Sequence, residues 1–254
     1  MKHLIFSKVD NIGIVQMKRI EGKGNALHRE LLEELNKCLR NVSADENIFS
    51  LILTGTGEYF SSGLDLNSIT NFNPDNIKKY FDLSSEVFFN LFSLPIPTIA
   101  AINGHAVAGG AVLAISCDYR IIYNNYKFGF TGINLGIPYP LIPLEIMKFA
   151  IPSYMISELL LQGKLIDSQT CFKKNIVHSL LSKKEDIIEN SIDYISKNFK
   201  APKKNYKFLK QNLQKPVLER IEKFKQKHDN LQFQLFNDDN LQKVLRDLTL
   251  KYKK

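Results

Sequence analysis

The spacing of apolar residues along the chain predicts alternating strands and helices. An opening hairpin is expected, with strands near 3–7 and 13–17, because short apolar runs flank Asp10-Asn11. Leucines then recur every three or four residues from Leu27 to Leu39, which predicts a helix. Three later apolar runs of strand length predict buried strands, namely 49–54, 97–102 and 118–123. Helices are expected between these runs, near 75–92 and 109–117. This order predicts an α/β fold with a largely parallel sheet covered on both faces.

Beyond residue 138 the pattern becomes mainly helical, with one more strand expected near 176–180. After residue 200, apolar residues at helical spacing predict an amphipathic helix that Pro216 interrupts. They are Tyr206, Leu209, Leu213, Val217, Ile221 and Phe224. Such a stripe needs a partner, either the body of this chain or another copy. We therefore divide the chain into a core, 1–199, and a C-terminal helical segment, 200–254.

The positive charge lies in that C-terminal segment. The chain carries a net charge of +8, and residues 200–254 alone hold 15 Lys and Arg against 6 Asp and Glu. A basic segment suits the phosphate groups of a ligand, but a solvated helical face explains it equally well. The sequence has neither an aromatic and basic RNA-binding motif nor zinc-finger spacing, so we expect no nucleic-acid partner.

Composition also argues against a disulfide framework, a metal site, a membrane span and export. Three widely separated cysteines, Cys38, Cys117 and Cys171, favour neither a disulfide framework nor a metal site, and a reducing, cytoplasmic compartment is expected. No apolar run approaches the roughly 18 residues of a membrane span. The first residues also lack the features of an export signal. We expect no membrane association and no metal.

Two glycine-containing turns are candidates for a functional site, because each follows a strand and exposes backbone N–H groups. In the first turn, Gly63 allows close approach of the backbone and Asp65 can cap the next turn, which leaves the N–H of Leu64 free. In the second, Gly109 and Gly110 open a helix, where N–H groups lack partners within the helix. Two such donors about 3 Å from one oxygen would form an oxyanion hole. Judged by spacing alone, both can also be purely structural turns.

Both turns lie within longer stretches that resemble the signature of the crotonase superfamily, which comprises enoyl-CoA hydratases and isomerases. These stretches are 60–66, 97–110 and 117–121, and the similarity extends to 25–27 and 128–136. The Ser-Gly-Leu-Asp-Leu loop and the Asp-Tyr-Arg strand are most similar to the Δ3,Δ2-enoyl-CoA isomerase branch. The resemblance covers about residues 1–200. It implies an α/β crotonase (ClpP-like) spiral of ββα turns with a helical C-terminal segment, assembled as a homotrimer or a dimer of trimers.

The resemblance further implies an acyl-CoA substrate and no prosthetic cofactor, with coenzyme A entering only as part of that substrate. Leu64 and Gly109 match the positions whose N–H groups bind the thioester oxygen and stabilise an enolate. Other residues match the walls of the substrate and CoA site, namely Lys23, Gly24, Asn25, Ser61, Ser62, Gly63, Asp65, Leu66 and Gly110. A lysine of the C-terminal segment would bind the phosphates of CoA.

Both glutamates that such hydratases use to activate water are replaced. Val112 stands at the first position, and Gly132 stands at the second, which isomerases also use. Glu145 and His105 are the remaining candidates for a catalytic base, although each also has a structural explanation. Three functions stay open. The first is an isomerase-like enzyme of fatty-acid metabolism with a replaced base, the second is another reaction such as thioester hydrolysis or decarboxylation, and the third is an acyl-CoA-binding protein without activity.

Overall fold

The computed structural model describes residues 1–18, 24–71, 74–182 and 186–252. Within these residues the strands are β1 (Leu4–Val9), β2 (Ile12–Met17), β3 (Ser50–Thr54), β4 (Tyr59–Ser61), β5 (Thr98–Ile102), β6 (His105–Val107), β7 (Tyr119–Tyr123), β8 (Lys127–Gly129), β9 (Ile166–Asp167) and β10 (Ser179–Leu181). The helices are α1 (Arg29–Ala44), α2 (Leu66–Asn71), α3 (Pro74–Phe92), α4 (Gly109–Ile115), the 3-10 helix η1 (Thr131–Leu135), α5 (Leu141–Ala150), α6 (Ser153–Leu160), α7 (Ser168–Lys173), α8 (Ile187–Asn198), α9 (Lys203–Phe236) and α10 (Asp239–Tyr252).

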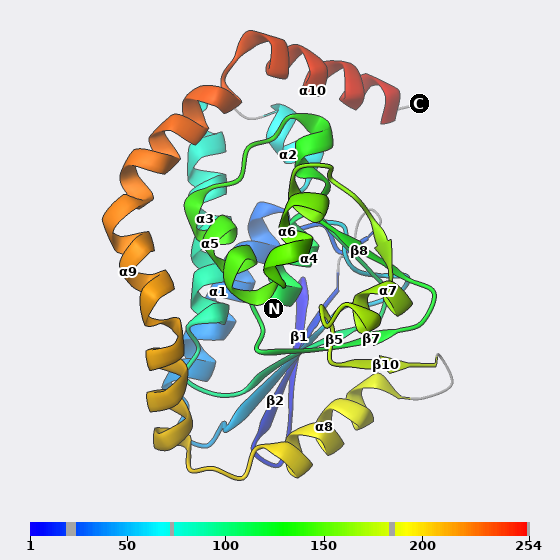
Figure 1. Ribbon diagram of the computed structural model, residues 1–254, viewed down its shortest axis with the longest axis vertical. Coiled ribbons are helices and arrows are strands. Elements are labelled where there is room, and N and C mark those ends of the chain that lie inside the picture. Colours follow the sequence, from blue (N-terminus) through cyan, green and yellow to red (C-terminus); the bar gives the residue numbers. More distant parts are fainter. Residues whose placement is uncertain (19–23, 72–73, 183–185, 253–254) are drawn as a thin grey trace.

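The strands form two sheets that the chain visits in turn (Figure 1). The larger has the order β1-β2-β3-β5-β7-β10 and is parallel apart from the β1–β2 hairpin; the smaller has the order β4-β6-β8-β9. β3, β5 and β7 enter the larger sheet, and β4, β6 and β8, which follow them, enter the smaller sheet before the next helix. This repeated ββα path is the crotonase spiral that the family resemblance implies.

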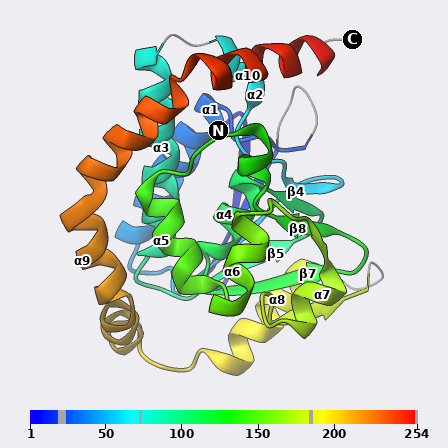
Figure 2. The same ribbon diagram turned by 45° about the horizontal axis from the view of Figure 1, so that its top comes forward.

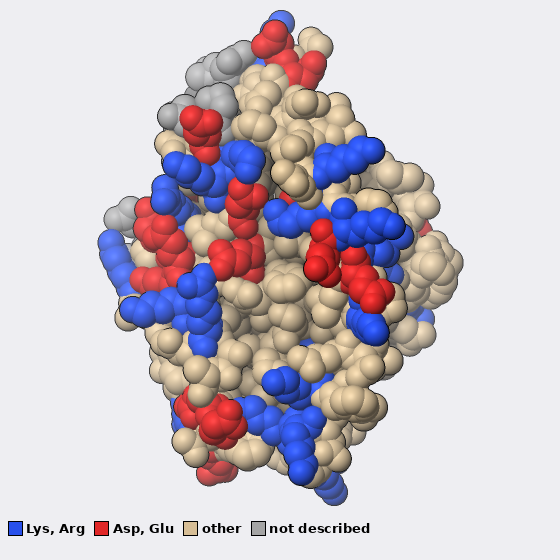
Figure 3. Space-filling view, turned by 90° about the vertical axis from the view of Figure 1, so that its left-hand side faces the viewer, with Lys and Arg blue, Asp and Glu red and all other residues tan. Residues whose placement is uncertain are grey.

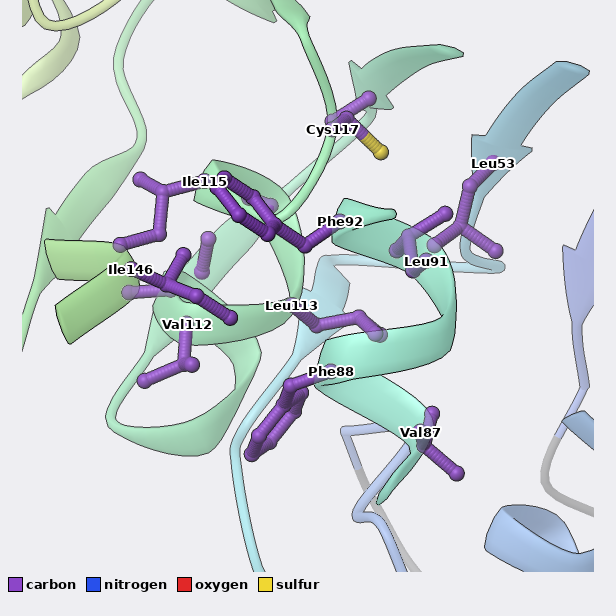
Figure 4. Packing of buried hydrophobic residues seen from close by; sticks show 14 of the residues in the cluster. Leu53, Val87, Phe88, Leu91, Phe92, Val112, Leu113, Ile115, Cys117 and Ile146 are labelled. Carbon is purple, nitrogen blue, oxygen red and sulfur yellow. The ribbon is translucent and has the colours of Figure 1, made fainter. Parts of the chain in front are cut away.

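The central strands β3 and β5 of the larger sheet are buried at every position because both faces of the sheet are covered there. Leu51 and Leu53 of β3 belong to the main core, to which α1, α3, α4 and α5 also contribute. Ile52, between them, packs on the opposite face with Ile187 and Ile195 of α8. Figure 4 shows the main core where α3, α4 and α5 meet, with apolar side chains from all three helices. Alternate residues of one strand therefore serve two separate cores.

The prediction that Pro216 interrupts the C-terminal helix is wrong. α9 runs without a break from Lys203 to Phe236 and contains that proline. Contacts on both sides of Pro216 hold the helix to the body. Gln214 Nε2 donates a 2.8 Å hydrogen bond to the carbonyl of Phe92, and Val217 and Ile221 are buried. Packing therefore outweighs the single helical hydrogen bond that a proline removes.

α9 and α10 pack on the body of their own chain. Figures 1 and 2 show α9 alongside α3 and α5, and α10 crossing beside α2. The apolar stripe is divided, because Val217 and Ile221 are buried whereas Leu209 and Leu213 are 61% and 70% exposed. In Figure 3, Lys and Arg groups on this side of the molecule lie close to Asp and Glu groups. Within the described part of the chain, no helix is both long and apolar enough to cross a membrane.

Candidate functional site

The two glycine turns lie against each other. They follow β4 and β6, which are parallel neighbours in the smaller sheet, so their ends meet at one edge. A Cβ added to Gly63, whose φ is +91°, would lie 2.8 Å from the nitrogen of Gly109. A Cβ on Gly110 would lie 2.1 Å from the carbonyl oxygen of Ser61. Only glycine fits at these two positions, because any side chain would push the turns apart.

This approach brings the N–H groups of Leu64 and Gly109 together. A Cβ on Gly109 would lie 3.3 Å from the nitrogen of Leu64. Since a Cβ lies about 2.5 Å from the nitrogen of its own residue, the two nitrogens are within about 6 Å of each other. That separation lets two donors reach one oxygen. Neither N–H donates a hydrogen bond within the described part of the chain.

The second turn has an uncommon backbone conformation at the residue before its donor. Ala108, directly before Gly109, has φ +49° and ψ −119°, which residues with a side chain rarely adopt. Its N–H donates a 2.8 Å hydrogen bond to the carbonyl of Gly129 on β8. Strained residues of this kind persist where the surrounding structure fixes them, and they are concentrated at functional sites.

Buried polar contacts hold the first turn in place. Asn25, 3% exposed, donates its side-chain N–H to the carbonyls of Thr56 (2.9 Å) and Tyr59 (2.8 Å). Ser61 Oγ donates to the carbonyl of Asn25 at 2.8 Å and accepts from the N–H of Gly63 at 3.2 Å. The Asp65 carboxylate accepts from Ser68 Oγ at 2.9 Å. These predicted site residues thus organise the loop.

The remaining predicted wall residues are distributed around the same loop. Ser62 and Leu66 line the pocket described below, and the N–H of Ser62 donates to the carbonyl of Gly24 at 2.7 Å. Lys23 lies outside the described residues, so its predicted contact with CoA stays a prediction.

An apolar pocket of about 160 Å³ adjoins the two turns. Leu64 and Gly109 line it, together with Phe81 and Phe88 of α3 and Val112 of α4. Figure 4 shows Phe88 and Val112 reaching toward the same region from their two helices. Among the described lining residues none is Asp, Glu, His, Lys or Arg. The polar side chains there are hydroxyl groups, contributed by Ser62, Ser84, Thr131 and Tyr139.

Gly132 also lines the pocket, and the hydroxyl of Tyr139 occupies the space beside it. The N–H of Gly132 donates a 3.2 Å hydrogen bond to Tyr139 Oη. A Cβ added to Gly132 would lie 2.9 Å from that same oxygen. Burial raises the pKa of Tyr139 to about 12, so the phenol is neutral at ordinary pH. Sequence reasoning missed this residue, although Pro138 and Pro140 on either side of it were a usable signal of a fixed loop.

Neither candidate base, Glu145 or His105, is among the residues that line the pocket. Glu145 is 3% exposed and accepts from Arg220 Nε at 2.9 Å and Lys148 Nζ at 2.8 Å. Burial alone would raise the pKa of Glu145, but these two cations outweigh it and hold the pKa below its usual value. His105 Nδ1 accepts from the N–H of Lys127 at 3.0 Å, and its ring lies between Tyr59 and Tyr126. Both side chains are used in structural contacts away from the pocket.

Comparison with known proteins identifies the family of this chain. The sequence profile described as enoyl-CoA hydratase/isomerase matches residues 7–252. The chain belongs to the enoyl-CoA hydratase/isomerase family. Two solved structures show the same fold. Human mitochondrial delta3-delta2-enoyl-CoA isomerase superposes with a TM-score of 0.92 at 23% identity, covering 99% of this chain and 98% of that one. An enoyl-CoA hydratase from Bacillus halodurans gives 0.87 at 22% identity, covering 96% and 99%.

Curated relatives carry both activity names of this enoyl-CoA hydratase/isomerase family. A short-chain-enoyl-CoA hydratase of Clostridium acetobutylicum is 34% identical over 138 residues, which is 54% of this chain and 52% of the relative. Enoyl-CoA delta isomerase 1 of Rattus norvegicus is 35% identical over 143 residues, 55% of this chain and 49% of the relative. The chain thus spans about half the length of these curated relatives. Among the described residues, no group of three or more His, Cys, Asp and Glu could hold a metal ion.

Proposed function

We propose that this chain binds acyl-CoA thioesters and stabilises the enolate of the bound thioester. The thioester oxygen accepts hydrogen bonds from the N–H groups of Leu64 and Gly109, and the acyl chain enters the apolar pocket. The observation that carries this proposal is the pair of unpaired N–H groups beside that pocket. Two fixed donors stabilise negative charge strongly where water is excluded, and loss of one such donor typically costs about 2.7–4 kcal/mol in the transition state.

The absence of carboxylates from the described pocket lining limits the chemistry that can follow binding. Val112 and Gly132 both line the pocket, so both positions at which the family resemblance implies a glutamate hold a residue that cannot transfer a proton. Hydration or isomerisation through a carboxylate at either position therefore does not take place in this chain. Enolate stabilisation needs only the backbone donors and is compatible with these residues.

Two outcomes of binding are distinguishable. Isomerase-like conversion of an enoyl-CoA is favoured by the similarity to the rat and human isomerases. Binding without turnover is favoured by the pocket, which offers hydroxyl groups but no carboxylate among its described residues. Incubation with 3-enoyl and 2-enoyl thioesters of several chain lengths, followed by ultraviolet absorbance, separates the two. Conversion at ordinary enzymatic rates would remove the second candidate.

The binding proposal itself is tested by a matched pair of glycine variants. Gly63→Ala places a methyl group 2.8 Å from the nitrogen of Gly109, whereas Gly57→Ala, at a similar φ of +70°, meets no atom within 4 Å. Both variants strain the backbone, but only the first displaces the two donors. Calorimetric titration with butyryl-CoA is expected to show at least tenfold weaker binding for Gly63→Ala and little change for Gly57→Ala. Equal affinity of the two variants would overturn the oxyanion role of these turns.

The C-terminal segment is proposed to bind the CoA phosphates, and several of its cations already have other partners. Lys210 pairs with Asp118, Arg220 with Glu145, and Lys225 with Asp229. Binding through the segment's other basic residues predicts an affinity that falls as salt rises. An affinity for butyryl-CoA that does not change with salt would leave the segment as a solvated helical face.

We propose a homotrimer or a dimer of trimers in the cytoplasm. The exposed apolar side chains of Leu209, Leu213 and Phe149 offer surface for such contacts between copies. Sedimentation velocity on the purified chain tests the assembly.

A further inference from the structure

We propose that Tyr139 selects the acyl chain by donating a hydrogen bond to a neutral oxygen close to the thioester. The site then prefers 3-hydroxyacyl-CoA and 3-oxoacyl-CoA to acyl-CoA of the same length without that oxygen. This inference rests on the proposed binding of acyl-CoA and names the substrate class of the same pocket.

The position of the hydroxyl supports this role. Tyr139 Oη lies 3.2 Å from the nitrogen of Gly132 and fills the space that a side chain at residue 132 would need. Leu64 and Gly109, the proposed thioester donors, line the same 160 Å³ pocket. An acyl chain held by its thioester oxygen therefore extends into a small space that this phenol also lines.

The hydroxyl has a hydrogen to donate. Within the described part of the chain, its one hydrogen bond is the bond that it accepts from Gly132. The raised pKa keeps the phenol protonated at ordinary pH, so it acts as a donor and not as a base. In a pocket lined mainly by apolar side chains, an oxygen on the ligand would give this half-buried phenol an acceptor for its hydrogen.

The loop that carries Tyr139 is fixed by α9. Gln232 Nε2 donates to the carbonyl of Pro138 at 3.1 Å, and the N–H of Leu141 donates to Asp229 Oδ1 at 2.8 Å. The prolines before and after Tyr139 restrict its backbone further. A donor held in one place loses little entropy on binding, so it discriminates well between ligands.

Charge decides which oxygen the pocket accepts. Among its described lining residues there is no Lys, Arg or His to pair with a carboxylate. Burying an unpaired carboxylate is far more costly than burying a hydroxyl or a carbonyl that receives a hydrogen bond. The preferred ligand oxygen is therefore neutral.

Other hydroxyl groups in the pocket are weaker candidates. Ser84 Oγ donates to the carbonyl of Phe81 at 2.8 Å, so its hydrogen is already used. Ser62 and Thr131 are half-buried like Tyr139, but their hydroxyl groups lie on short side chains, one bond from Cβ. Tyr139 is the long, fixed donor of the set.

The test compares butyryl-CoA, 3-hydroxybutyryl-CoA and acetoacetyl-CoA by calorimetric titration. The protein is expected to bind the two oxygenated ligands about fivefold more tightly than butyryl-CoA, the value of one neutral hydrogen bond. Tyr139→Phe should abolish this preference, so that the three ligands bind the variant with equal affinity. Tyr126→Phe is the matched control, because that hydroxyl contacts Glu58 outside the pocket, and it should keep the preference.

A second variant guards against a folding defect. Gly132→Ala keeps the phenol but pushes its hydroxyl away from a Cβ at 2.9 Å, and it should also reduce the preference. A wild-type protein without preference, or a preference that survives in Tyr139→Phe, would overturn the role of Tyr139 while leaving acyl-CoA binding intact. Failure of all three ligands to bind would instead overturn the proposed function, and this inference with it.

Discussion

The pocket and the contact between α9 and the body differ in whether they contain ionised side chains. We call the second region the α9 seam and define it by Asp118, Glu145, Lys210 and Arg220. In the seam, two largely buried carboxylates accept hydrogen bonds from cations of α9, with Lys210 Nζ 2.8 Å from Asp118 and Arg220 Nε 2.9 Å from Glu145. In the pocket, the described lining has hydroxyl and backbone N–H donors and no ionised side chain.

This difference concerns Glu145 of α5, which the sequence offered as a candidate base. A general base works best when its pKa is near the working pH and it can reach the substrate. The cations of the seam hold the pKa of Glu145 low, and its oxygens point to them and not to the pocket. The carboxylates of the α9 seam therefore attach the C-terminal helix to the body, whereas the described pocket lining holds only neutral donors.

The largest effect is expected from breaking the buried ion pair of the seam. Asp118 also accepts from the N–H and Oγ1 of Thr98 and from Tyr206 Oη, and Lys210 is only 6% exposed. Lys210→Met leaves the carboxylate buried without its cation, which should lower the free energy of unfolding by about 3–5 kcal/mol. Urea denaturation measures the change.

A control and a rescue variant sharpen this prediction. Lys197→Met removes an exposed pair with Asp193 and should cost less than about 1 kcal/mol. Asp118→Asn combined with Lys210→Met should recover part of the loss, since no unpaired charge remains. A loss below about 1 kcal/mol in the single Lys210 variant would contradict the view that the seam depends on this pair.

The next effect comes from placing a carboxylate in the pocket. Gly132 is not at positive φ, so its backbone allows a side chain, but Tyr139 Oη occupies the space. Gly132→Glu alone should therefore give little isomerisation of 3-enoyl-CoA. Gly132→Glu with Tyr139→Ala should increase conversion by about 10²-fold or more, the usual contribution of a positioned acid or base. Ultraviolet absorbance of the conjugated product measures it. Equal rates in the single and double variants would contradict the blocking role of Tyr139.

Much of the fold could be predicted because its signals are local. The hairpin turns at Asp10, which has φ +51°, and the buried strands β3 and β5 are continuous apolar runs. The strands of the smaller sheet were not predicted. β4, β6, β8 and β9 have two or three residues each, and a strand that short is defined by its neighbours and not by its own sequence.

In the candidate site, too, the residues with a local sequence signal could be predicted and those that depend on distant residues could not. The turns at Gly63 and Gly109 carry their own conformational requirements, so the sequence could nominate Leu64 and Gly109. The roles of Glu145 and Tyr139 depend on distant residues, because Arg220 lies 75 positions after Glu145 and Gln232 lies 94 positions after Pro138. Helical periodicity predicted α9 but could not identify the residues of the body that α9 contacts.

A smaller effect is expected in the pH dependence of stability. The pKa of Glu145 is lower in the folded chain than its value of 4.5 without interactions, so its contribution to stability is present above that pH and is lost as the pH falls further. The free energy of unfolding should decrease as the pH is lowered from about 5 to about 3, and Glu145→Gln should flatten part of this slope. Arg220→Gln should flatten it by the same mechanism. An unchanged slope in both variants would show that the seam does not control the titration of Glu145.

The smallest effect concerns the strained residue beside the pocket. Ala108 has φ +49° and ψ −119°, a conformation that glycine adopts without a steric penalty. Ala108→Gly should raise the free energy of unfolding by about 0.5–1 kcal/mol, because relief of strain exceeds the added entropy of the unfolded chain. It should also weaken the binding of butyryl-CoA about two- to threefold, since a freer backbone positions the Gly109 N–H less well. Thermal unfolding and calorimetric titration of one preparation test both signs. A variant that is both less stable and an equally good binder would show that the strain at Ala108 does not serve the site.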